Sequence, residues 1–302
     1  MPARRTLVNI YGSPVGHSLS PVICNHVFDA MGLLDHHYGA VECPTLLTDT
    51  NAWTRDLLSD GLLGTCLTMP LKVQAMSLIP HEFLADHHAK VINSVNTTWQ
   101  HEHSGQFKAT NLDWKSVLNC LVTALTKEQS PFPPSLPLLF EQNRAVGFVI
   151  GAGGAARAAI YALQEMGAGS VLIVNRDQEE IDVLVKEWSG TILIKSIASS
   201  ESLQKELAQL ADIGQTVVAA VACIPSEYAP VTLEEKRVFE LAKQVFAFKK
   251  DLNAVSLSSE FLPIPDRPIL LDMAYKPPMT PMRALAESHG WETVCGAQAV
   301  LL

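Results

Sequence analysis

Apolar runs of strand length alternate with stretches of helical periodicity along the whole chain. Such alternation is typical of an α/β protein, in which helices pack on a largely parallel sheet. In the first third, the runs expected to form strands or strand ends are residues 7–11, 64–69, 91–97 and 109–112. The pattern therefore predicts an α/β layer architecture.

Two helices are expected between these strands. One begins at Pro21, whose missing N–H costs nothing in a first helical turn, and it ends before Gly32. Its apolar stripe of roughly 3.6-residue period consists of Val22, Val27, Phe28 and Met31. The other helix begins near Lys72, just after Pro70.

A proline-rich segment at residues 129–143 interrupts the pattern and is expected to be a surface connector between two domains. After it, a buried strand (145–150), a helix of small residues (155–166) and a second strand (170–174) form one βαβ unit. Further strands are expected at residues 191–194, 217–222, 245–248 and 269–273.

Composition narrows the class of protein. With 48% hydrophobic and 18% charged residues the chain is globular, and 302 residues suffice for two domains. A net charge of −9 argues against a nucleic-acid partner, which needs a basic surface. No apolar run reaches the roughly 18 residues of a membrane span. Six scattered cysteines without metal-ligand spacing indicate reduced thiols in the cytoplasm and no metal site.

A glycine-rich turn lies where the 145–150 strand meets the next helix. Gly151 permits a tight turn, and Gly153 lets the backbone approach a pyrophosphate closely. The helix that begins at Gly154 and Ala155 would point free N–H groups and its positive dipole end at the phosphates. A strand before, a helix after and a second strand ending in Asn175-Arg176-Asp177 are the context that a dinucleotide-binding turn requires.

The residues at the end of that second strand are expected to determine whether the adenosine ribose is bound with a free 2′-hydroxyl, as in NAD, or with a 2′-phosphate, as in NADP. Arg176 could stack on adenine or pair with a 2′-phosphate, whereas Asp177 could accept a hydrogen bond from a free 2′-hydroxyl. Gln178, Glu179 and Glu180 add no second cation, and their negative charge would repel a phosphate. NAD and NADP both stay open, and the local charge favours NAD.

Two hydroxyls, Ser18 and Ser20, precede the helix at Pro21. Hydroxyls beside helix N–H groups make a cradle for a carboxylate, and the alternative is ordinary N-capping by Ser20.

Four motifs, in order, resemble those of the shikimate dehydrogenase family. Residues 64–72 (GTCLTMPLK) are similar to its G-x-N-V-T-x-P-x-K motif, whose lysine is the catalytic group. The other three are residues 95–97 (VNT), 111–113 (NLD) and 272–280 (DMAYKPPMT). The resemblance covers essentially the whole chain.

The resemblance implies a catalytic pair, Lys72 and Asp113. Oxidation of a ring alcohol needs a hydride acceptor and a group that handles the hydroxyl proton, and a carboxylate beside the lysine would orient its ammonium. The substrate is expected to be shikimate or quinate, and the cofactor NAD or NADP. The residues expected to bind the substrate are Ser18, Ser20, Thr68, Asn96 and Tyr275.

The expected organisation has three parts. An N-terminal α/β substrate domain spans residues 1–125, and a Rossmann dinucleotide-binding domain spans residues 126–276. Residues 277–302 are expected to form a C-terminal helical segment that packs back on the substrate domain.

Several positions depart from the family pattern. They are Cys24, Cys66, Asn93, Ala109, Leu112, Ala219, Ala220, Val221 and Lys276. The sequence also stops before the glutamine that usually touches substrate in the last helix of the family.

Trp114 and the Asn-Arg-Asp strand end look more like fungal-type relatives. These are the dehydrogenase domain of the AROM polypeptide, the quinate dehydrogenases and the dehydrogenase-like domain of the quinate-pathway repressor. Two hypotheses follow: a dehydrogenase, and a non-catalytic regulatory domain that recognises the same acids or a protein partner.

Overall fold

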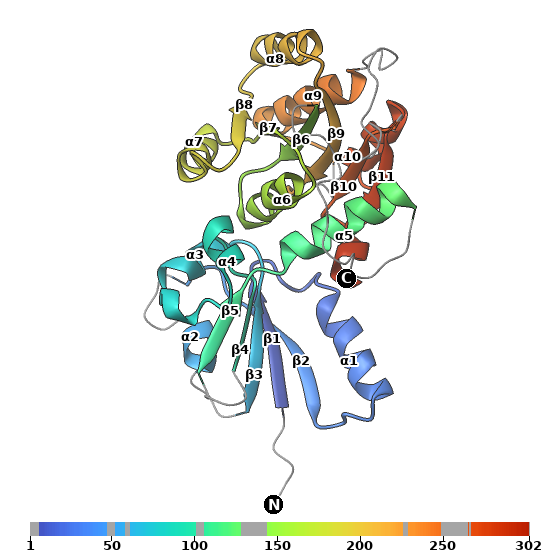
Figure 1. Cartoon of the computed structure of the whole chain (residues 1–302). Coiled ribbons are helices and arrows are strands. Elements are labelled where there is room, and N and C mark those ends of the chain that lie inside the picture. Colours follow the sequence, from blue (N-terminus) through green and yellow to red (C-terminus); the bar gives the residue numbers. More distant parts are fainter. Residues whose placement is uncertain are drawn as a thin grey trace, which may run out of the picture. The chain divides into compact units, whose positions relative to one another are not determined.

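The computed structural model describes residues 6–46, 52–57, 61–100, 106–127, 144–225, 229–248, 265 and 267–301. The proline-rich connector expected at residues 129–143 lies outside this part of the chain. The chain divides into two units, Met1–Leu112 and Asp113–Leu302 (Figure 1). This division falls earlier than the boundary expected after residue 125, because helix α5 (Asp113–Thr126) packs with elements of the second unit. The packing of residues 277–302 on the first domain stays a prediction.

The first unit contains a five-stranded mixed sheet in the order β2-β1-β3-β4-β5. Strand β1 is parallel to both of its neighbours, and β4 is antiparallel to both of its own. The strands are β1 (Thr6–Gly12), β2 (His36–Glu42), β3 (Leu62–Leu67), β4 (Thr97–Gln100) and β5 (Phe107–Thr110).

Helices cover both faces of this sheet. On one face α1 (Ser20–Ala30) packs through Phe28 against a small cluster that includes Ile10 and Tyr38. On the other face a larger cluster gathers around Tyr11, Trp53 and Leu71. The elements on that side are α2 (Ala52–Leu57), α3 (Leu71–Gln74), η1 (Ala75–Ser77), η2 (His81–Phe83) and α4 (His87–Ile92).

The helix expected from Pro21 is confirmed, but its apolar stripe does not face the core. Val22 and Met31 are about two-thirds exposed, at 69% and 67%, and Val27 is also exposed. Phe28 is the member of the stripe that packs against the cluster. Periodicity therefore predicted the helix correctly and its buried face wrongly.

The second unit contains six parallel strands in the order β11-β10-β9-β6-β7-β8. Counted along the chain from β6, this is the 3-2-1-4-5-6 order of the Rossmann fold, whose direction reverses between the first and fourth strands. The strands are β6 (Ala145–Ile150), β7 (Ser170–Val174), β8 (Leu193–Ser196), β9 (Thr216–Ala222), β10 (Ile269–Asp272) and β11 (Glu292–Cys295).

Helices also cover both faces of the second sheet. Phe148 shares a buried cluster with Leu207 and Leu241 from two helices of one face. On the other face α6 (Gly154–Glu165) lies so close to β6 that a Cβ on Gly147 would be 2.7 Å from the Leu163 side chain. The remaining helices are α7 (Gln178–Glu187), α8 (Ser200–Asp212), α9 (Leu233–Ala247), α10 (Pro281–Ser288) and α11 (Gly296–Leu301).

Two of the expected strands are wrong. Residues 245–248 form the last turn and C-cap of α9, whose apolar residues face the core at helical spacing. Within 91–97, α4 ends at Ile92, and Asn93 takes the left-handed conformation (φ 51°) before β4 begins at Thr97. In contrast, the expected strands at 145–150 and 170–174 coincide with β6 and β7.

Two expectations from composition can be compared with the structure. All six cysteines lie among the described residues and are free thiols. No helix within the described part of the chain is long and apolar enough to cross a membrane.

Candidate functional site

The ends of two neighbouring strands in the first unit are joined by backbone hydrogen bonds. The Thr68 N–H donates to the Tyr11 carbonyl (2.8 Å), and the Ser13 N–H donates to the Met69 carbonyl (2.9 Å). Between them, a Cβ on Gly12 would lie 2.2 Å from Cγ2 of Thr68. The residues after β1 and after β3 are therefore held at one edge of the sheet.

The two serines of the predicted carboxylate cradle lie after β1. The Ser18 N–H donates to the Val15 carbonyl (3.0 Å), and the Ser20 N–H donates to Oγ of Ser18 (3.3 Å). Helix α1 begins at Ser20, its N-cap is Leu19, and no side chain caps it. Ser20 is thus not the N-cap that the alternative interpretation requires.

Lys72 and Asn96 lie at the same edge of the sheet. Lys72 is in the short helix α3 after β3, and its carbonyl accepts from the Val95 N–H (2.9 Å). The Asn96 carbonyl accepts from the Leu67 N–H (2.7 Å), and its side-chain Oδ1 accepts from the Leu112 N–H (2.8 Å). The backbone thus brings Lys72 and Asn96 to the end of β3, and the Asn96 side chain also fixes the chain at Leu112.

Behind the serines, two positions that depart from the family pattern face the same cluster. Cys24 of α1 and Cys66 of β3 both pack against the cluster that contains Tyr38. Burial raises the pKa of the Cys24 thiol and of the Tyr38 hydroxyl, so both groups are neutral near pH 7. These substitutions leave an uncharged wall beneath the start of α1.

Asp113 and Tyr275 belong to the second unit. Asp113 is the first residue of α5. Tyr275 lies in the loop after β10, which is braced by the buried Asp272: its carboxylate accepts from the Thr280 hydroxyl (2.5 Å) and the Ala274 N–H (3.1 Å). The approach of Asp113 and Tyr275 to Lys72 stays a prediction.

The glycine-rich turn has the backbone that a phosphate cradle needs. Gly151 has φ +116°, and a Cβ there would be 3.1 Å from the Cys223 carbonyl oxygen. Gly153 is the N-cap of α6, it is exposed, and nothing lies within 4 Å of where its Cβ would be. Because Gly154 and Ala155 open the helix beyond it, their N–H groups are among those that helical geometry leaves without intrahelical partners.

At the end of β7 the predicted ribose-reading residues have local roles. Nδ2 of buried Asn175 donates to the Asp177 carbonyl (3.0 Å) and to Oε2 of Glu180 (2.7 Å). Oδ1 of Asp177 accepts from the Glu179 N–H (2.9 Å) and caps α7. Arg176 is exposed.

The sequence interpretation missed Arg237 of α9. Its guanidinium donates to the carbonyls of Asn175 (2.8 Å), Arg176 (3.2 Å) and Ala198 (2.8 Å). It therefore brings a second cation to the end of β7. No sequence signal could have revealed it, since a lone arginine on a helix is usually a solvated charge.

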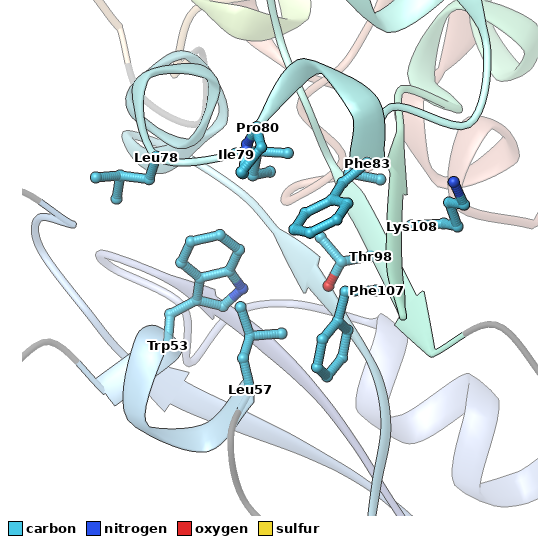
Figure 2. Close-up of a pocket in the computed structure, with 10 residues that line it drawn as sticks. Trp53, Leu57, Leu78, Ile79, Pro80, Phe83, Thr98, Phe107 and Lys108 are labelled. Atoms are coloured by element: carbon cyan, nitrogen blue, oxygen red, sulfur yellow. The ribbon is translucent and has the colours of Figure 1, made fainter. Parts of the chain in front are cut away.

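The first unit also has an apolar cavity of about 190 Å³ (Figure 2). Trp53, Phe83 and Phe107 turn toward one another around it, and Thr98 lies behind them. None of the predicted site residues lines this cavity. Since a polyhydroxylated acid needs several polar partners, the cavity does not fit the expected substrate.

The sequence is similar to known proteins. Residues 10–98 match the shikimate dehydrogenase substrate binding domain. The whole chain is 31% identical to part of the pentafunctional AROM polypeptide of Kluyveromyces lactis, of whose length it spans 16%.

Solved structures resemble the chain over nearly all of its length. The dehydroquinate dehydratase and shikimate dehydrogenase part of Schizosaccharomyces pombe AROM aligns with a TM-score of 0.66 at 26% identity, covering 98% of this chain and 48% of that one. A shikimate 5-dehydrogenase of Thermus thermophilus, solved in complex with NADP(H) and shikimate, aligns with a TM-score of 0.62 at 23% identity, covering 98% and 88%. At 23% identity, the resemblance to the Thermus thermophilus structure shows a shared fold alone.

Proposed function

The chain belongs to the shikimate dehydrogenase family, and from this premise we propose that it interconverts shikimate, or quinate, with its 3-dehydro acid by means of a nicotinamide dinucleotide. The observation that carries the proposal is the convergence of the first unit's motif residues on one sheet edge. Thr68, Lys72 and Asn96 come from segments tied together there by backbone hydrogen bonds. An edge where strands end is where α/β proteins bind small ligands.

The acid would be held by short polar side chains. Ser18 and Ser20 would receive its carboxylate at the start of α1, where hydroxyls and N–H groups suit an anion. Thr68, Asn96 and Tyr275 would hydrogen-bond the remaining oxygens. A hydroxylated ring carries many such oxygens, and a site built to pair each of them rejects analogues that lack one.

The proton would be handled by Lys72. In the oxidation direction the C–H bond at the reacting carbon breaks with its electron pair, the O–H bond breaks, and a C=O bond forms. Lys72 Nζ would accept the hydroxyl proton and return it in the reverse direction, and Asp113 would orient the lysine. The nicotinamide ring, when bound, supplies the hydride acceptor.

The second unit would hold the dinucleotide, and its glycine turn fits that group. The open space at Gly153 admits a pyrophosphate against the backbone N–H groups of Gly154 and Ala155. Gly151 is needed for the left-handed turn that precedes them. The adenosine ribose would lie at the corner formed by Asn175, Arg176 and Asp177.

Turnover provides the test. The purified chain is mixed with shikimate or quinate, each with NAD or NADP, and the absorbance of the reduced nicotinamide is followed. Replacement of Lys72 by Ala should lower kcat by about 10²–10⁴-fold, the usual contribution of a positioned proton-transfer group. Lys90→Ala, which removes an exposed lysine from α4 of the same unit, is the control and should leave kcat unchanged.

Other outcomes have definite meanings. Turnover that survives Lys72→Ala would exclude Lys72 as the proton-transfer group. Calorimetric binding of either acid without turnover by any dinucleotide would overturn the dehydrogenase and favour a regulatory domain that senses the same acids.

A further inference from the structure

The apolar cavity of the first unit is built by elements that lie apart in the sequence. Trp53 and Leu57 belong to α2, Phe83 belongs to η2, and Phe107 is the first residue of β5. These side chains surround a volume of about 190 Å³ (Figure 2). Because side chains that border a cavity lack van der Waals contacts on one side, an occupant of matching shape would supply those contacts.

The volume and the lining of the cavity suit one aromatic ring. A cavity of about 150 Å³ with apolar walls is large enough to bind benzene. The cavity here, at about 190 Å³, has room for such a ring and a short side chain. Trp53, Phe83 and Phe107 turn toward one another around it. Aromatic rings in offset or edge-to-face contact attract one another by more than their buried area accounts for, so these walls favour a ring over an aliphatic chain.

The polar atoms behind the cavity are bonded to one another. The Thr98 hydroxyl shares a hydrogen bond with the Thr65 hydroxyl (2.7 Å), which also accepts from Nε1 of Trp53 (2.9 Å). Both threonines are buried. A polar atom of a ligand would have to break these bonds to find a partner there. The part of a ligand that enters the cavity should therefore be apolar.

Lys108 supplies a cation at the edge of the cavity. The residue lines the cavity, and its ammonium donates to the backbone carbonyl of Glu82 (3.3 Å) in η2. An ammonium carries three N–H donors, so it can hold this carbonyl and a carboxylate at the same time. Lys108 is partly buried, whereas the Glu82 side chain is exposed to solvent, where its negative charge is screened. The apolar walls thus end beside a positive charge.

We propose that this cavity is a ligand site additional to the proposed substrate edge, and that it takes a small carboxylic acid with one aromatic ring. The ring lies between Trp53, Phe83 and Phe107, and the carboxylate lies against Lys108. The site is contained within the first unit, and the inference does not rest on the proposed dehydrogenase activity.

Calorimetry on the full chain with three probes tests the two halves of the ligand separately. Hydrocinnamate has a phenyl ring and a carboxylate, hydrocinnamyl alcohol has the ring without the charge, and hexanoate has the charge without a ring. Hydrocinnamate should bind with a Kd on the order of 1 mM or below, as expected for a ligand of this size. The alcohol and hexanoate should each bind about fivefold more weakly.

Two variants, each with a matched control, locate the binding. Leu57→Trp fills part of the cavity and should weaken hydrocinnamate binding by at least about tenfold. Its control is Leu34→Trp, at a position of the same unit that is 80% exposed, and it should bind within about twofold of wild type. Lys108→Met keeps an apolar stem and should reduce the affinity for hydrocinnamate to that for the alcohol. Lys90→Met removes an exposed lysine of α4 and should have no effect.

Circular dichroism establishes that each variant is folded, and Lys108→Met tests the site even if Leu57→Trp does not fold. Hydrocinnamate binding that a folded Leu57→Trp leaves intact would overturn the site, because the acid would then bind elsewhere. Equally tight binding of hexanoate would overturn the aromatic class, and unchanged binding by Lys108→Met would overturn the role of the cation. A wild type that binds none of the probes would overturn the whole inference. Turnover of shikimate or quinate tests the proposed function and is independent of all these outcomes.

Discussion

The two sheets of this protein differ in how completely their strands are buried and in which contacts stabilise them. In the second unit every residue of β6 and β9 is buried, as expected for parallel strands with helices on both faces. In the first unit β2 has a single buried residue, and α1 above it has none. The second sheet gains stability from continuous apolar burial. The first relies more on backbone hydrogen bonds between the segments that follow its strands and on polar side-chain contacts.

Both cores also contain buried polar contacts. In the first unit buried Thr65 accepts from Nε1 of Trp53 (2.9 Å) and shares a hydrogen bond with Thr98 (2.7 Å). In the second unit the buried Asp272 carboxylate accepts from the Thr280 hydroxyl (2.5 Å), and Nε1 of Trp291 donates to the Phe246 carbonyl (3.1 Å). Under the proposed function, the first sheet would present side chains to a substrate and the second would present backbone N–H groups to phosphates. The first must then fix many polar atoms, whereas the second mainly needs a rigid turn.

Breaking the ion pair of the buried Arg157 in α6 would test how robust the second unit is. Arg157 is 4% exposed, and its guanidinium pairs with Glu187 at the end of α7. Glu187→Gln leaves a buried charge without its counter-ion and should lower the free energy of unfolding by about 3 kcal/mol, measured by urea denaturation. The double variant with Arg157→Met should recover much of this loss.

The Lys195–Glu206 pair provides the control, because its cation is more exposed than that of the Arg157 pair (19% against 5% of the side chain). Its oxygen–nitrogen distance is 2.7 Å, and Glu206→Gln should cost less than about 1 kcal/mol. Similar losses in Glu187→Gln and Glu206→Gln would show that burial of Arg157 adds nothing to the pair.

A methyl group added at Gly12 would test the dependence of the first unit on close approach at its edge. Gly12→Ala places a Cβ 2.2 Å from Cγ2 of Thr68 and 2.7 Å from the Met69 carbonyl oxygen, so the two strand ends must separate. We expect a loss of about 1–3 kcal/mol in urea denaturation and weaker binding of the acid, with dinucleotide affinity unchanged.

Gly16→Ala is the matched control for Gly12→Ala. Nothing lies within 4 Å of a Cβ at Gly16, so its stability should stay within about 0.5 kcal/mol of wild type. Tolerance of Gly12→Ala at this level would mean that the edge is more pliable than its packing indicates.

Alkaline pH should produce the smallest of these effects, and it acts on buried tyrosines of the first unit. Burial raises the pKa of Tyr11 and Tyr38 above the ordinary value of 10.0, and Tyr11 also donates to Asp56 (2.7 Å). Above pH 10 the unfolded chain loses these protons first, so stability is full below pH 10 and falls as pH rises.

Circular dichroism together with tyrosinate absorbance would follow this transition. Tyr38→Phe removes one of the two titrating groups and should move the alkaline midpoint upward. An alkaline unfolding midpoint that is the same in Tyr38→Phe and in the wild type would show that other ionisable groups determine the pH at which the protein unfolds.

Prediction from the sequence succeeded where burial is continuous and failed where tertiary packing chooses between states. The strands at 145–150 and 170–174 were predicted to the residue, because two-sided burial demands uninterrupted apolar runs. Residues 245–248 are equally apolar but complete α9, whose register with the core is not visible in four residues.

The sequence by itself determined the class of fold, the glycine turn and the order of the family motifs, because each depends on neighbours in the chain. Only the tertiary structure decided which face of α1 is buried and which charges meet at the end of β7. Arg237 lies 61 residues after Arg176, and only the packing of α9 beside β7 brings the two together. Local patterns record what a residue prefers, whereas electrostatics and burial depend on distances in space that the fold alone sets.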